Sequence, residues 1–182
     1  EYLDVLIQKS YRLKSLTDDL FEATKAATGN IAVTLEPLSL EQLVEQCLGE
    51  FDKQIGESDL TFVTNLSSQA VVLGDGSLMW RVLENLFSNG FKYSMPNTRV
   101  YVDGFEQEDS WCLEIKNISN SPLNVPVEEL TDRFRRGDSA RTSEGSGLGL
   151  SIVESFMLAQ NGDFMVSVDG DLFKVAVCLP KT

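Results

Sequence analysis

Histidine is missing from the 182 residues of this chain. Because imidazole is a common acid–base group and metal ligand, chemistry that needs a histidine within the chain is excluded. Positive charge is also scarce: 15 Lys and Arg stand against 28 Asp and Glu, a net charge of −13. We therefore expect no nucleic-acid partner, since binding a phosphate backbone needs an excess of basic residues. A single nucleotide stays compatible, because a metal ion and a few basic side chains can balance its charge.

Long apolar runs are missing too, so we expect no membrane segment in this fragment and no signal peptide. The chain begins at Glu1 rather than Met, which is typical of a piece of a longer protein. Cysteine is rare: Cys47, Cys112 and Cys178 lie far apart and are odd in number. This spacing predicts neither a metal site nor a disulfide framework, and a reducing cytosolic setting fits it best.

The first 29 residues carry apolar side chains at spacings of four and three, a pattern that is broken once, at Lys9: Tyr2, Leu6, Leu13, Leu16, Leu20, Ala23 and Ala27. Such a seam favours a helix packed lengthwise in a bundle, although a plain amphipathic core helix fits as well. Gly29 and Asn30 would end the helix. We place a domain boundary there, with residues 1–29 as half of a dimerisation element and residues 30–182 as a second domain.

The second domain alternates between the periods of strands and helices. A capping box of Ser39 and Gln42 opens one helix, and an Asp75-Gly76 turn precedes another. The predicted strands are 31–38, 60–66 with 70–73 as its partner, 111–116, and a hairpin of 164–168 and 173–179. The predicted helices are 39–55, 77–93 and 148–161, each with one apolar face. The fold class expected is α+β: a two-layer sandwich of a mixed sheet with three helices on one face.

Polar side chains gather on one side of the helix over residues 77–93. Asn85, Asn89 and Lys92 fall within a narrow arc, which Arg81 and Ser88 extend. Two amides and an ammonium offer oxygen ligands for a hard cation and a positive charge for phosphate. Most polar stripes are solvated helix faces. Against that reading, Asn is a mediocre helix former and occurs here twice, four residues apart.

A glycine run, GSGLGL, spans residues 145–150 and precedes the helix over 148–161. Gly145, Gly147 and Gly149 let the backbone approach another group closely. A glycine-rich turn that opens a helix points N–H groups and a positive helix end outward, which suits phosphate oxygens. A loop that simply caps an ordinary helix is the alternative for the run on its own.

Two motifs together carry a family resemblance. LENLFSNGFKYS, followed some fifty residues later by RFRRGDSARTSEGSGLGLSIV, resembles the ATP-binding domain of bacterial sensor histidine kinases, which has the Bergerat ATPase fold. The resemblance covers the whole chain, with residues 1–29 similar to the second helix of the dimerisation and phosphotransfer domain. It implies ATP and Mg²⁺ as ligands.

The resemblance also implies roles for residues of the first motif. Asn89 would be the amide ligand of Mg²⁺, and Asn85 would order water or metal near the γ-phosphate. Lys92 would approach the phosphates, and Tyr93 would lie beside the nucleotide. Such a site transfers a phosphoryl group by positioning and charge neutralisation.

The second motif carries the remaining implied contacts. Phe134 matches the edge of an ATP lid, and cations within the lid could reach the β- and γ-phosphates. The phosphate cradle would be the glycine run, with Leu148 between its last two glycines. The implied lid cations and cradle residues are Arg135, Arg136, Arg141, Gly145, Gly147 and Gly149.

One departure from the family pattern affects the nucleotide. Where relatives carry Asp-x-Gly-x-Gly after a strand, this chain has Asn117-Ile118-Ser119-Asn120-Ser121. Asn117 keeps an acceptor oxygen for the adenine amino group but loses the charge, while Ser119 and Ser121 replace both glycines. Exchanging a charge-assisted hydrogen bond for a neutral one costs ~1 kcal/mol, so we expect weakened rather than abolished nucleotide binding.

The function implied is that of a protein-histidine kinase catalytic domain in a two-component system. The intact protein would transfer the ATP γ-phosphoryl group to a histidine on an absent bundle helix, then to a response-regulator receiver domain. We expect a homodimer through the bundle helices and a cytoplasmic location, as part of a membrane-anchored sensor. Without a histidine, this chain cannot phosphorylate itself on histidine. The alternatives are a degenerate nucleotide-sensing or docking module and a serine kinase of the anti-sigma type.

Overall fold

The computed structural model describes residues 31–123 and 148–182, together with eight helical positions before residue 31: Tyr2, Ile7, Lys9, Ser10, Leu13, Lys14, Thr17 and Thr24. The elements are β1 (Glu36–Ser39), α2 (Leu40–Glu50), α3 (Asp52–Glu57), β2 (Thr61–Asn65), β3 (Val71–Gly74), α4 (Gly76–Tyr93), β4 (Arg99–Glu106), β5 (Ser110–Ile118), α6 (Gly149–Ala159), β6 (Asp163–Asp169) and β7 (Leu172–Pro180). The division at residue 29 stays a prediction.

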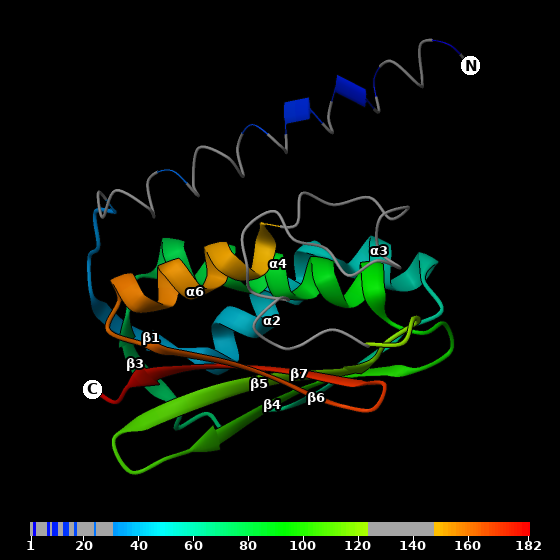
Figure 1. The fold of residues 1–182 in the computed structure, drawn as a ribbon. Helices are drawn as coiled ribbons and strands as arrows, with labels where there is room; N and C mark the ends of the chain where they lie inside the picture. The colour runs from blue at the N-terminus through cyan, green and yellow to red at the C-terminus, as the bar shows by residue number, and fades with distance from the viewer. Residues whose placement is uncertain are drawn as a thin grey trace.

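The sheet has five strands in the order β2-β4-β5-β7-β6, and α2, α4 and α6 lie on one of its faces (Figure 1). It is mixed, because β2 runs parallel to β4 while the other pairs are antiparallel. A separate two-stranded sheet pairs β1 with β3. The predicted α+β fold, a two-layer sandwich with a mixed sheet, is therefore confirmed.

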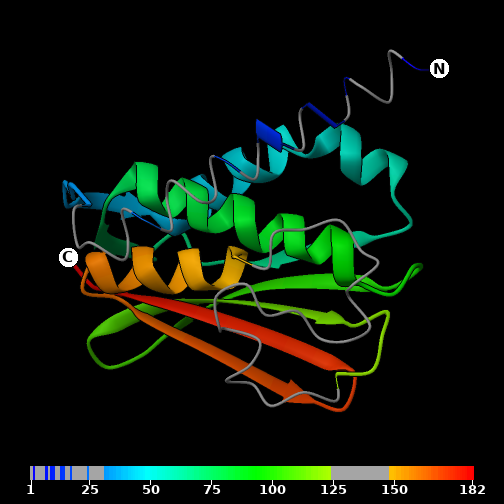
Figure 2. The ribbon, with the colours of Figure 1, turned by 45° about the horizontal axis from the view of Figure 1, so that its top comes forward.

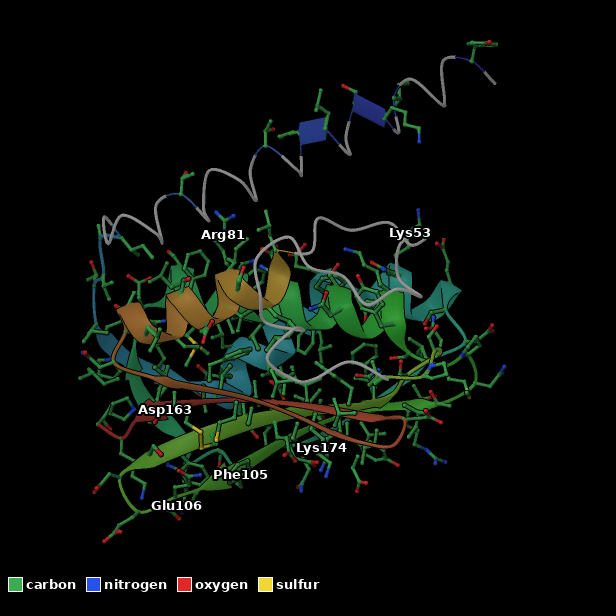
Figure 3. All side chains as sticks on the ribbon, viewed as in Figure 1. Lys53, Arg81, Phe105, Glu106, Asp163 and Lys174 are labelled. Atoms are coloured by element: carbon green, nitrogen blue, oxygen red, sulfur yellow. A yellow bond between two sulfur atoms is a disulfide. The ribbon has the colours of Figure 1, made fainter. Side chains whose placement is uncertain are left out.

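Alternation along β5 shows which way each side chain points. Leu113 and Ile115 are buried in the core beneath the helices, whereas Lys116 points to the opposite face. There its ammonium contacts Asp103 at 2.7 Å and Glu114 at 3.2 Å. The hydrogen bond to Asp103 raises the pKa of Lys116 above its usual value. Figure 3 shows labelled side chains on this outer side of the sheet, which the helices leave uncovered.

The core has the helix faces that the sequence predicts. The buried side of α4 consists of Leu78, Met79, Val82, Leu83, Leu86, Phe87 and Gly90. Ser39 caps α2 through its hydroxyl, which accepts from the Gln42 N–H at 3.3 Å. The predicted 39–55 helix is instead two helices, α2 and α3, because the helix is interrupted at Phe51. That break places the Phe51 ring against Phe87 and Phe91, at centroid distances of 6.1 and 5.5 Å.

Several predicted strands need correction. β3 pairs with β1, not with β2, so the predicted pairing of 60–66 with 70–73 is wrong. β1 is shorter than the predicted 31–38, and β4 was not predicted at all. At the predicted Asp75-Gly76 turn, Asp75 is the N-cap of α4. The β6–β7 hairpin is confirmed, with Gly170 at φ +61° in its turn.

The prediction of no disulfide is also wrong. Cys112 and Cys178 are direct partners across β5 and β7, and their sulfurs are bonded. Antiparallel register joins positions 66 residues apart, and no local spacing could have revealed this pairing. Cys47 is free and buried in α2, where burial, with Glu84 and Glu50 nearby, raises the pKa of its thiol to about 12.

Candidate functional site

The polar stripe of α4 lies opposite its buried face, as predicted. Asn85 and Asn89 are half-buried and Lys92 is exposed. The Asn85 amide nitrogen donates to the Arg81 carbonyl at 2.9 Å, which leaves its Oδ1 atom available. The Asn89 side chain makes no hydrogen bond to any residue that the structure describes. Within the part of the chain that the structure describes, two amide oxygens, one turn apart, are thus available to a ligand.

The first residue of α6 lies against these amides. A Cβ atom added to Gly149 would come 3.1 Å from Asn85 Oδ1, 3.6 Å from Asn89 Nδ2 and 3.7 Å from Asn89 Oδ1. The sequence places these groups about sixty residues apart, and the fold brings them together. The positive N-terminal end of α6 therefore lies beside two neutral amides, a combination that suits an anion together with a hard cation.

From that point α6 runs back along α4 in the opposite direction (Figure 2). The Arg81 guanidinium carbon lies 5.9 Å from the centre of the Phe156 ring, and the Gln160 Oε1 atom accepts from the Asp75 N–H at 2.7 Å. Contacts between the helices thus extend from the N-cap of α4 to Asn89. The last turn of α4, beyond Asn89, makes none of these contacts with α6.

Buried polar groups lie at this C-terminal end of α4. Ser94 ends α4 and forms a bridge to Ser119, while Asn117 lies in the last part of β5. Asn117 is on the side of the strand that faces the helices, together with Leu113 and Ile115. The sequence places Asn117 after its strand, whereas it is a buried strand residue. Reasoning from sequence missed Ser94, because one serine at a helix end carries no distinguishing signal.

The remaining predicted contacts divide into two groups. Lys92 and Tyr93 lie on the last turn of α4, and Asn120 donates to their carbonyl oxygens at 3.5 and 2.8 Å. Leu148 is buried at the N-cap of α6. The others lie outside the described residues: Phe134, Arg135, Arg136, Arg141, Gly145 and Gly147.

Neither an all-protein metal cage nor a membrane helix is found in the described part of the chain. No three His, Cys, Asp or Glu side chains within residues 31–123 and 148–182 gather to hold a metal. None of the helices described there is long and apolar enough to cross a membrane. The two asparagines are neutral. Most of the negative charge around a cation at the Asn85–Asn89 stripe would therefore have to come from an anionic ligand.

Comparison with known proteins gives the family. The model of the "Histidine kinase-, DNA gyrase B-, and HSP90-like ATPase" family matches residues 74–182. The chain is 29% identical to "Sensor protein VanSC" of Enterococcus gallinarum over 182 residues, which are 99% of this chain and 50% of that protein. It is 32% identical over 157 residues to "Sensor histidine kinase HprS" of Escherichia coli, which are 86% of this chain and 34% of that protein.

Solved structures agree on the fold. "Acinetobacter baumannii histidine kinase AdeS" superposes with a TM-score of 0.83 at 20% identity, covering 99% of this chain and 84% of that one. A structure of histidine kinase ThkA "in complex with response regulator protein TrrA" gives 0.75 at 18% identity, covering all of this chain and 51% of that one. The chain spans half or less of the length of the two curated relatives named above.

Proposed function

Because the chain belongs to the family of histidine kinase-, DNA gyrase B- and HSP90-like ATPases, as the ATP-binding catalytic domain of a sensor histidine kinase, we propose that ATP binds with Mg²⁺ along the C-terminal half of α4. In the intact protein, the γ-phosphoryl group would pass to a histidine of a bundle helix that lies outside this chain. A response-regulator receiver domain would then accept it.

The approach of Gly149 to Asn85 and Asn89 carries this proposal. Phosphate oxygens seated at the start of α6 would meet its backbone N–H groups and the positive end of the helix. The Asn89 amide oxygen would lie beside the same oxygens. Because α6 covers α4 on the N-terminal side of Asn89, the rest of the nucleotide has to extend the other way, toward Lys92 and Ser94.

The amide oxygens of Asn85 and Asn89 fit a magnesium ion that is bound mainly through phosphates. Mg²⁺ in nucleotide sites keeps several waters and takes one or two protein oxygens, together with substrate phosphates. Asn89 Oδ1, with Asn85 Oδ1 one turn earlier, supplies such oxygens without adding negative charge. When bound, the ion would neutralise charge on the transferred phosphoryl group. Asn85 would hold a water or the ion through the oxygen that its hydrogen bond to Arg81 leaves free.

Other residues would position the nucleotide. The exposed Lys92 ammonium can reach phosphate oxygens from the end of α4, and Tyr93 can lie along the nucleotide from the same turn. Phe134, Arg136, Arg141, Gly145 and Gly147 complete the proposed contacts. For all of them the support is the sequence motif.

The wider assignment rests on the relatives. The chain has no histidine, so the phosphoacceptor must come from another segment or another chain. ThkA is described in complex with a response regulator, which supports a receiver domain as the partner. Dimerisation through residues 1–29 and a cytoplasmic position within a membrane-anchored sensor complete the proposal.

Calorimetric titration of the chain with ATP and Mg²⁺ tests it. We expect binding that is weakened at least 100-fold by Asn89→Ala, equivalent to about 2.7 kcal/mol of binding free energy. The matched control is Asn65→Ala, an exposed asparagine on the edge strand β2, which should bind like the original chain. Thermal unfolding of both variants checks that each keeps its fold.

Absence of ATP binding by the unmodified chain would overturn the proposal. That result would favour the docking module, for which the Asn117–Ser121 departure is the motivation. Equal binding by the unmodified chain and by Asn89→Ala would leave ATP binding intact and remove Asn89 from the site.

A further inference from the structure

Three buried polar residues lie where the chain after α4 runs against the end of β5. Ser94, Asn117 and Ser119 are each 5% exposed. The backbone holds them together: Ser94 bridges to Ser119, and the Met95 N–H donates to the Ile118 carbonyl at 2.8 Å. We call these three residues the amide–hydroxyl cluster.

Two members of the cluster have hydrogen-bonding capacity left over. Ser119 Oγ donates to the Ser121 carbonyl at 2.7 Å and accepts from the Ser121 N–H at 3.3 Å. Ser94 Oγ is buried and has no hydrogen-bond partner among the described residues. Asn117 makes one long contact, from Nδ2 to the Ile118 carbonyl at 3.5 Å. Buried polar groups are usually paired, so Ser94 and Asn117 are suited to a ligand that supplies partners.

The cluster contains no carboxylate. Among the described residues, Asp75 is the one buried acidic side chain. It lies at the other end of α4. The 19 residues from Asp75 to Ser94 correspond to about 28 Å along the helix, at a rise of about 1.5 Å per residue. Hydroxyls and amides both donate and accept hydrogen bonds, whereas an ionised carboxylate only accepts. The hydrogen bonds that the cluster can offer are therefore of both kinds.

This difference bears on the choice of purine. Adenine presents an amino donor at position 6 with an acceptor at N1; guanine presents a carbonyl acceptor at position 6 with a donor at N1. A carboxylate can pair with the adenine amino group but repels the guanine carbonyl. The Asn117 amide can pair with either edge after a half-turn of its terminal torsion, and the Ser94 hydroxyl can rotate to match.

Resting on the function proposed above, we propose that the amide–hydroxyl cluster reads the nucleobase without selecting strongly for adenine, so that the site accepts GTP as well as ATP. Specificity is a difference between two affinities, and the cluster has no group that penalises guanine. With the phosphates at Gly149 and Asn89, the base would reach the cluster at the end of the same helix, about 7 Å further along α4.

Competitive calorimetry with Mg²⁺ and either ATP or GTP tests this inference on the full chain. We expect the two dissociation constants to lie within about tenfold of each other. Asn117→Asp places a carboxylate in the cluster and should raise the preference for ATP about 100-fold, because the guanine carbonyl would face a negative charge. Asn65→Ala should leave the ratio unchanged.

A second probe guards against a variant that fails to fold. Inosine triphosphate carries the guanine edge at positions 1 and 6 without the 2-amino group, and it should bind the unmodified chain within about tenfold of ATP. If ATP binds while both GTP and inosine triphosphate bind more than about 100-fold more weakly, the inference is overturned but the proposed function stands. If a folded Asn117→Asp variant keeps the original ratio, Asn117 does not read the base. Absence of binding by all three nucleotides would instead overturn the proposed function.

Discussion

The two ends of α4 differ in how their polar groups are satisfied. At the N-terminal end, Asp75 Oδ1 accepts from the N–H groups of Ser77 and Leu78, at 3.0 and 3.1 Å, and Oδ2 accepts from the Thr34 N–H at 2.7 Å. The Asp75 N–H in turn donates to Gln160. At the C-terminal end, Ser94 Oγ has no partner among the described residues.

The contrast separates stability from binding along a single helix. Paired buried groups at one end join α4 to α6 and to the segment before β1, and they contribute to the stability of the fold. At the other end, the Ser94 hydroxyl, which has no partner among the described residues, adds little to stability and remains available to a ligand. Substitutions at the two ends should therefore change different measurements.

The largest effect is expected from Asp75→Ala. Loss of the helix cap and of the bond to Thr34 should lower the free energy of unfolding by about 3 kcal/mol, a decrease in melting temperature of about 6–12 °C. ATP affinity should change less than about threefold, because the Asn85–Asn89 stripe is more than two turns away. Denaturation and calorimetry measure the two effects.

Asp75→Asn is the matched control for that variant. It keeps one acceptor oxygen at the cap and should cost less than half as much stability. Equal losses for the two variants would show that one neutral acceptor oxygen cannot replace the carboxylate at this cap.

Gly149→Ala should weaken ATP binding and leave stability nearly unchanged, the reverse of what we expect for Asp75→Ala. The added methyl group would sit 3.1 Å from Asn85 Oδ1 and displace it. We expect ATP binding to weaken about tenfold, or ~1.4 kcal/mol, with melting nearly unchanged. Gly49→Ala in α2 is the control, because a Cβ there meets nothing within 4 Å. Unchanged affinity in Gly149→Ala would remove this contact from the site.

The smallest effect is expected from Ser94→Ala. Removing a buried hydroxyl that has no partner among the described residues should raise the free energy of unfolding by up to about 1 kcal/mol, while nucleotide affinity falls about threefold. Ser119→Ala, which deletes a hydroxyl with two hydrogen bonds, should instead lower stability by about 1 kcal/mol. A loss of stability in both variants would mean that the Ser94 hydroxyl is satisfied in the folded chain.

Much of the fold could be predicted from periodicity. The buried face of α4 and the β6–β7 hairpin follow from repeats of 3.6 and 2 in the sequence. The pairing of β3 with β1 could not be predicted, because short strands of similar composition do not specify their neighbours. β4 carries the same repeat of 2 in its buried Val100 and Val102, so the sequence offered a signal for this strand that our prediction missed.

The candidate site, too, could be predicted from the sequence only in part. The stripe of Asn85, Asn89 and Lys92 could be recognised because all three lie on one element, where helical geometry fixes their relative positions. The contact with Gly149 could be expected only through the family resemblance. Ser94 gave no signal at all, since its importance comes from burial against β5.

The sequence alone determined the amphipathic faces of the helices, because 3.6 residues per turn place every fourth side chain on one side. It also determined the chemistry available: amide oxygens, glycines and no histidine. Only the tertiary structure decided that Gly149 lies against Asn85 and Asn89, that Cys112 bonds to Cys178, and that Ser94 is buried where it bridges to Ser119. Contacts between residues so far apart in the chain depend on strand register and helix packing, which no local pattern specifies.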